Sequence, residues 1–181
     1  MPLQLSSFSE PVRLILAELD RYPFPLTRSK SEEEGAARRL EGKSAGDLFP
    51  SARHPDEALS GLLLRLNSWE KSHHLSQDLN TAEGSYWHGI AHRIEPDYGN
   101  AGYWFRRVGK HPIFPQLHEE AGRVLADRST SWRPGEEWDP FLFIRWCEEA
   151  NEGGDENKKT TAIAIQKVEW KLLFEWCGAT V

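Results

Sequence analysis

Long apolar stretches are missing from this chain of 181 residues, of which 39% are apolar and 28% charged. No run approaches the roughly 20 consecutive apolar residues that a membrane-spanning helix needs, so we expect no membrane partner. Residues 1–24 also lack a basic segment ahead of an apolar one, and Glu10, Glu18 and Asp20 interrupt the only candidate for a secretory signal. The sequence therefore favours a soluble, cytoplasmic protein.

Cysteine is scarce, and Cys147 and Cys177 each stand beside a tryptophan in a segment of helical pattern. A reduced cysteine in that setting behaves as a small buried apolar group, so we expect two free thiols rather than a disulfide. A chain of this length buries about two-thirds of its unfolded surface without covalent support. We predict a single helical domain over residues 1–181.

An excess of positive charge is also lacking, because the formal net charge is -6 and the isoelectric point about 5.7. Binding to nucleic acid needs a concentrated basic face, which argues against nucleic acid as a partner. The glycine-rich phosphate loops are missing, so no nucleotide cofactor is expected, and no G-x-S-x-G elbow marks a nucleophile. The remaining partners are a small molecule or another protein.

Strand-like alternation and repeats of 20 to 50 residues do not occur, whereas helical spacing of apolar residues recurs along the chain. The pattern predicts an all-α fold, a single compact domain of about six or seven helices. The clearest helical segments are 10–20, 54–69, 81–95, 97–108, 114–127, 139–150 and 159–177.

Residues 28–53 are rich in Ser, Glu, Gly, Lys and Arg and hold few large apolar residues before Leu48 and Phe49. Such a composition contributes little to a core and predicts a polar, mobile segment with one short helix over 32–41. A flap over a site and simple disorder both fit a loop of this length. Limited proteolysis is expected to cut here first.

The segment from Tyr86 to Pro112 reads as two short helices joined by a turn. Trp87 and Ile90 stand at the W-x2-L spacing of a tetratricopeptide unit, and other positions of that pattern follow in order. The connection is shorter than in that repeat and no second copy occurs, so the hairpin is only weakly tetratricopeptide-like.

His88 and His92 stand four residues apart, and Glu95 follows three residues later, so that one face of a helix presents all three. Two imidazoles and a carboxylate suit a divalent transition metal such as Zn, Fe(II), Mn or Ni. Gly89 replaces the glutamate of the H-E-x-x-H protease motif, so that peptidase chemistry is not expected. Further ligands could come from any of four other histidines: His73, His74, His111 and His118.

Two other interpretations of this segment stay open. Arg93, Arg106, Arg107 and His111 form a local group of cations that suits a small anionic ligand, although carboxylates elsewhere in the chain could pair with them instead. The histidines could equally form a polar seam within the hairpin.

The functional hypothesis is a His/Glu/Arg pocket that binds a small anionic ligand or a metal, in which metal-assisted hydrolysis uses a bound water as nucleophile. The alternative is a non-catalytic module for protein interaction, in which a helical, tryptophan-rich surface docks a partner and the histidines are structural. Eight tryptophans suit either packing between helices or such a surface.

The segments YWHGIAHRIEPDYGNAGYWFRRVGKHP, WDPFLFIRWCEEA and IQKVEWKLLFEWC together resemble an uncharacterised family of bacterial and fungal helical proteins. The resemblance covers roughly residues 80–177. It implies an all-helical domain and carries no known activity.

Overall fold

The computed structural model describes residues 7–28, 37–128 and 130–180. Within these ranges the chain forms helices and no strand, which confirms the predicted all-α fold. The helices are α1 (Glu10–Glu18), the 3-10 turn η2 (Leu19–Arg21), α3 (Ala45–Leu48), α4 (Pro55–Arg65), α5 (Trp69–Gln77), α6 (Ala82–Ile94), α7 (Tyr98–Val108), α8 (Phe114–Ala126), α9 (Pro140–Glu152) and α10 (Glu156–Gly178).

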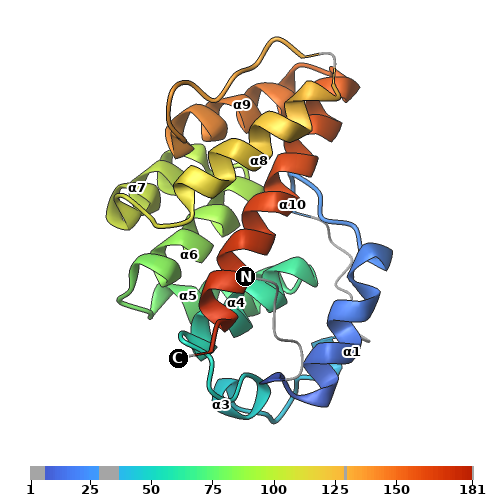
Figure 1. Cartoon of the computed structure of the whole chain (residues 1–181), viewed down its shortest axis with the longest axis vertical. Helices are drawn as coiled ribbons and strands as arrows, with labels where there is room; N and C mark the ends of the chain where they lie inside the picture. The colour runs from blue at the N-terminus through green and yellow to red at the C-terminus, as the bar shows by residue number, and fades with distance from the viewer. Residues whose placement is uncertain (1–6, 29–36, 129, 181) are drawn as a thin grey trace.

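Helix α6 lies at the centre of the fold, and every residue of it except Ala82 is buried. It packs between α5 and α7, while the long α10 runs through the molecule and contacts α4, α8 and α9 (Figure 1). An entirely buried helix must place its polar side chains against partners inside the protein. The histidines and the arginine of α6 are therefore held among neighbouring helices.

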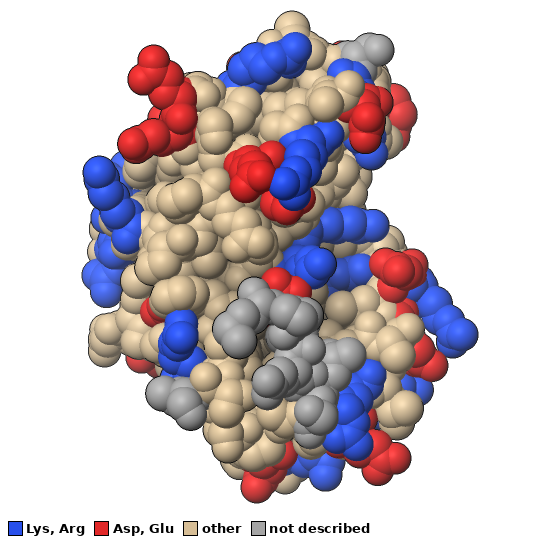
Figure 2. Space-filling view, viewed as in Figure 1, with Lys and Arg blue, Asp and Glu red and all other residues tan. Residues whose placement is uncertain are grey.

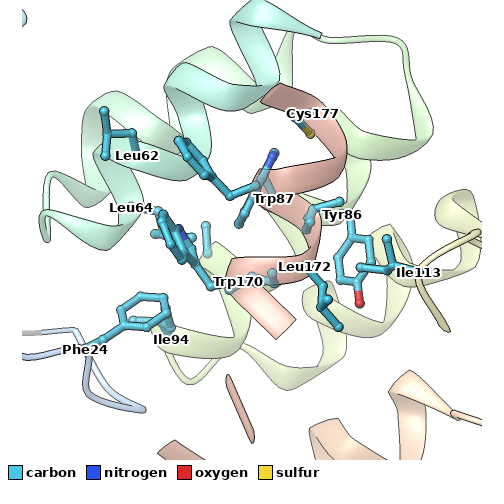
Figure 3. Close-up of a cluster of buried hydrophobic side chains, with 14 of the residues drawn as sticks. Phe24, Leu62, Leu64, Tyr86, Trp87, Ile94, Ile113, Trp170, Leu172 and Cys177 are labelled. Carbon is cyan, nitrogen blue, oxygen red and sulfur yellow. The ribbon is translucent and has the colours of Figure 1, made fainter. Parts of the chain in front are cut away.

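Two glycines allow the central helices to approach closely. A Cβ on Gly89 would lie 2.9 Å from the ring of Phe105 on α7, and a Cβ on Gly61 would lie 2.5 Å from the ring of Trp87. The carbonyl oxygen of Gly61 also accepts a hydrogen bond from the indole of Trp170 at 2.7 Å. Figure 3 shows the core in which Trp87, Trp170 and Cys177 meet near leucines of α4.

The helix predicted over 54–69 is confirmed as α4, but α4 already ends at Arg65, and the following helix α5 was not predicted. Asn67 has a φ of +58°, in the left-handed region that asparagine tolerates better than most residues, and α5 starts at Trp69. A local hydrogen bond closes the turn, since the N–H of Ser68 bonds to the carbonyl oxygen of Leu63 at 2.9 Å. As a result the described residues hold more helices than the six or seven expected.

The end of the 28–53 segment packs against the core. Ser44 and Asp47 cap α3 reciprocally, and the buried ring of Phe49 meets Phe8 and Phe174 edge to face at centroid distances of 5.3 and 5.9 Å. Residues 29–36, which include half of the helix expected over 32–41, lie outside the described residues. The mobility of this segment stays a prediction.

Both cysteines are free and buried, as expected, and burial raises the pKa of Cys147 to about 12. Among the described residues no helix has the length and apolar character required to cross a membrane. Helices α6 and α7 do form a hairpin around residues 95–97, but a likeness to a tetratricopeptide unit is not confirmed.

Candidate metal centre

Three histidines from two adjacent helices converge, and we call them the histidine cluster: His73 on α5 with His88 and His92 on α6. One ligand atom of each lies within 4.8 Å of those of the other two. His88 and His92 occupy successive turns of one helix face, as their spacing predicts. Because α5 packs against α6, the ring centroid of His73 lies 4.2 Å from that of His88.

Two tryptophans flank the cluster. The indole of Trp69 stacks on His73 at a centroid distance of 4.5 Å, and Trp104 packs against His88 at 4.2 Å. The indole N–H of Trp69 donates to the carbonyl oxygen of Ala91 at 2.8 Å, which fixes the start of α5 on α6. His88 is buried and His73 is only half-buried, so solvent approaches the cluster beside His73.

Ser76 determines which nitrogen of His88 carries a hydrogen atom. Its hydroxyl oxygen lies 2.8 Å from the carbonyl oxygen of Ser72, a separation that requires the hydroxyl hydrogen between the two oxygens. Ser76 Oγ is therefore the acceptor in its 3.0 Å contact with Nδ1 of His88. Nδ1 carries the hydrogen, and Nε2 of His88 presents a lone pair to the cluster.

The lone pair of His88 faces Nε2 of His92 at 3.0 Å. On the opposite edge of the same ring, Nδ1 of His92 lies 3.3 Å from Glu95 Oε2 and 4.0 Å from Asp97 Oδ2. A neutral imidazole has one N–H. Placed on Nε2, this hydrogen is donated to the lone pair of His88. The side-chain amide of Asn100, whose Nδ2 lies 3.4 Å from Nδ1 and 3.1 Å from Nε2 of His92, can then donate to the lone pair that remains. A neutral His92 is therefore bonded at both ring nitrogens.

A metal ion bound by both rings would take the place of the hydrogen between the two Nε2 atoms. The observed 3.0 Å is close to the separation of about 3.3 Å that follows from tetrahedral Zn–N bonds of about 2.0–2.1 Å. The nearby nitrogen of His73 favours a metal ion over a proton at this position, because a proton is shared by two atoms whereas a metal ion binds three or more ligands.

The surroundings keep two of the rings in the neutral form that binds metals. Burial, followed by the proximity of His73 and His92, lowers the pKa of His88 from 6.5 to about 3. Burial also lowers the pKa of His73, with smaller contributions from His92, His74 and Arg28. At neutral pH both rings therefore offer a lone pair without first losing a proton.

The predicted metal set of His88, His92 and Glu95 is brought together only in part. Glu95 approaches Nδ1 of His92, the nitrogen that points away from His88. It belongs instead to a second group suited to a metal ion, formed by His92, Glu95 and Asp97, whose carboxylates are exposed. In the histidine cluster Glu95 is thus placed to orient His92 rather than to complete the ligand set.

Arg93 was predicted to bind a ligand, but the structure places it in the core. Its guanidinium pairs with the carboxylate of Glu169, both side chains being fully buried, and it lies 4.6 Å from the ring centroid of Phe143. The same carboxylate accepts a hydrogen bond from the hydroxyl of Tyr86 at 3.1 Å. No part of Arg93 reaches solvent, so its charge serves the packing of α6 on α10.

The other predicted ligand residues lie away from the histidine cluster. Arg107 is exposed and lies over the ring of Trp104, at 5.1 Å from its centroid, whereas Arg106 and His111 line a separate cavity beyond α7. His111 is buried, with Nε2 3.6 Å from Glu83 Oε1. The pKa of Glu83 is lowered to about 2, first by the nearby ring of His111 and then by the hydrogen bond from the indole of Trp176 at 2.8 Å.

Sequence reasoning named His73 only as one of several further ligands and did not single out Ser76. Both lie on α5, which the pattern did not separate from α4, and they stand three residues apart on one helix face. That spacing was the one signal that could have linked them to the same site.

No protein-family model, curated protein or solved structure matches this chain. The resemblance to a family of helical proteins, like the alternative function in protein interaction, therefore stays a prediction.

Proposed function

We propose that this chain binds one divalent transition metal ion through His73, His88 and His92. The observation that carries the proposal is the convergence of three imidazoles from two helices, with one nitrogen of each within 4.8 Å of the others and the Nε2 atoms of His88 and His92 3.0 Å apart. A metal ion at this point would be bound by all three rings at once.

The donor atoms favour Zn, Co or Ni over Mg or Ca. Imidazole nitrogens bind the later transition metals, whereas Mg and Ca take oxygen ligands. Two of the three rings have a partner at the nitrogen opposite the metal position: Ser76 accepts from Nδ1 of His88, and Glu95 lies against Nδ1 of His92. Partners of this kind fix the tautomer and direction of the ligand ring.

Three protein ligands leave a coordination position for water or substrate, which is the pattern of catalytic rather than structural zinc sites. A metal in that setting lowers the pKa of bound water and supports hydrolysis. We therefore extend the proposal to metal-assisted hydrolysis as the reaction class. The chain's own contribution is the aromatic wall of Trp69 and Trp104, which restricts water to the side of His73.

Cobalt titration tests the proposal. Co²⁺ added to protein stripped with chelator should give visible d–d absorption at one equivalent, and His88→Ala with His92→Ala should abolish it. His74→Ala is the matched control, because this exposed histidine is next to His73 but outside the cluster, and it should bind as the unmodified chain does.

A lasting hydrogen bond between His92 and His88 in place of the metal would contradict the proposal. In that case Co²⁺ binding at one equivalent is absent. Equal Co²⁺ binding by the double variant would contradict it as well, because the ion would then be held elsewhere.

A further inference from the structure

A cavity of about 840 Å³ lies between the end of α7, the first turn of α8 and the loop that leads into α9; we call it the α7–α9 cavity. Its volume suits a small organic ligand. Helix α7 separates it from the histidine cluster, because Trp104 packs on His88 whereas the next residue, Phe105, lines the cavity. The inference below is therefore independent of metal binding.

The inner wall of the α7–α9 cavity is aromatic. Phe105, Phe114, Trp138 and Phe141 all line it, and they come from α7, α8, the loop and α9. Phe105 and Trp138 are already buried, so the half-buried rings of Phe114 and Phe141 offer most of the apolar contact to a bulky ligand.

The rim carries opposite charges on different segments. Arg106 and Lys110 stand at the end of α7, and Glu136 and Glu137 stand on the loop before α9. All four are exposed, and within residues 7–28, 37–128 and 130–180 none of them forms an ion pair. In Figure 2 basic side chains lie at the left edge of the molecule and acidic ones above them. Charges of both signs therefore remain for a ligand.

The loop that carries the acidic residues is fixed in place. Nε2 of His118 on α8 donates to the carbonyl oxygen of Gly135 at 3.0 Å, and Gly135 has a φ of +80°, which favours glycine. Asp139 accepts hydrogen bonds from the N–H groups of Phe141 and Leu142 at 2.8 and 3.3 Å, so its carboxylate caps α9. Asp139 is thereby engaged, and Glu136 and Glu137 form the acidic rim.

We propose that the α7–α9 cavity binds a small zwitterion with a bulky apolar body, of the chemical class of hydrophobic dipeptides. The anionic group of the ligand faces Arg106 and Lys110, and its cationic group faces Glu136 and Glu137. A ligand of a single charge is disfavoured, because one of the two rims would repel it. The guanidinium of Arg106 suits a carboxylate in particular, since it can donate two parallel hydrogen bonds.

Three matched peptides test this inference by isothermal titration calorimetry: phenylalanyl-phenylalanine, its N-acetyl derivative and its C-terminal amide. Each derivative removes one charge and keeps both rings. The free dipeptide should bind about tenfold tighter than either derivative, as expected for the loss of one charge-assisted hydrogen bond. Equal affinities, or tighter binding of either derivative, would overturn the zwitterion, and no binding of any peptide would overturn the site.

Charge variants locate the two contacts. Arg106→Gln with Lys110→Gln should weaken the free dipeptide to the level of the amide and leave the affinity of the amide unchanged. Glu136→Gln with Glu137→Gln should weaken the free dipeptide to the level of the N-acetyl derivative and leave the affinity of that derivative unchanged. Arg107→Gln is the control, because this exposed arginine lies on Trp104 outside the cavity. If it weakens binding as much as the Arg106 and Lys110 pair does, the contact assignment is wrong.

Discussion

Ser76 Oγ lies 3.0 Å from Nδ1 of His88 and accepts its hydrogen. A serine of α5 thereby directs the lone pair of a histidine on α6 toward His92. This hydrogen bond is buried, so the orientation of the His88 ring does not depend on solvent. A side chain that binds no metal itself thus sets the geometry of the proposed centre.

Replacing this serine should weaken metal binding without removing it. Ser76→Ala leaves all three imidazoles, but His88 then lacks its partner at Nδ1, and we expect Co²⁺ affinity to fall about tenfold or more. Ser68→Ala provides the control, since this buried serine at the start of α5 has no hydrogen-bond partner for its Oγ. If both variants bind Co²⁺ with unchanged affinity, Ser76 has no role in orientation.

The stability of the fold should depend on Glu83 below pH 4.5. Contacts with His111, Trp176 and His54 accompany a pKa of about 2 in the folded state, against 4.5 in the unfolded chain. Because the folded pKa is the lower one, this contribution is complete above pH 4.5 and is lost as the pH falls toward 2. It amounts to about 3–4 kcal/mol at most, at about 1.4 kcal/mol for each pKa unit.

Urea denaturation at several pH values measures this effect. The unmodified chain should lose stability between pH 4.5 and 2 more steeply than Glu83→Gln does. Glu137→Gln, a change to an exposed glutamate, should follow the unmodified chain. Identical slopes for the unmodified chain and Glu83→Gln would show that this carboxylate contributes nothing to acid stability.

The same substitution should have opposite effects at two helical glycines. Gly61→Ala places a Cβ 2.5 Å from the buried ring of Trp87, and overpacking of this kind costs about 1–3 kcal/mol. Gly122→Ala in the exposed face of α8 meets nothing within 4 Å and should stabilise the chain by about 0.5–1 kcal/mol. Thermal or urea unfolding measures both. A stabilised Gly61→Ala would mean that Trp87 is free to move aside.

The buried pair of Arg93 and Glu169 should couple strongly. Glu169→Leu leaves the guanidinium without its counter-ion in the core and should cost about 3–5 kcal/mol of unfolding free energy, and Arg93→Met a comparable amount. The double variant should be less destabilised than the sum, because it leaves no unpaired charge. Additive effects in this cycle would contradict the pairing.

The sequence predicted the elements more completely than the contacts between them. Periodicity located α6 and α7 and placed His88 and His92 on one face, because these features depend on spacing along a single helix. The turn at Asn67 escaped prediction because leucines continue the helical pattern up to it, whereas the left-handed asparagine and a local hydrogen bond from Ser68 to Leu63 end the helix there. The new direction of α5 beyond this turn is what brings His73 to the site.

Side-chain direction explains the remaining differences at the site. Glu95 follows His92 at helical spacing, yet it meets the nitrogen that points away from His88, a detail that spacing does not specify. Arg93 and Arg106 both belong to the basic segment in sequence, but one is enclosed beside Glu169 and the other lines a cavity beyond α7. The two arginines lie on different helices, α6 and α7, so their nearness in the sequence does not bring them to one site.

The contacts of Trp69 with His73 and of Trp104 with His88 have an optical consequence. Indoles at centroid distances of 4.5 and 4.2 Å from the imidazoles lie within quenching range of a paramagnetic ion held by those rings. The intrinsic fluorescence of the protein should therefore dim as Co²⁺ is added and recover with a chelator. Tryptophan fluorescence therefore reports how much of the histidine cluster is occupied by metal, without an added label.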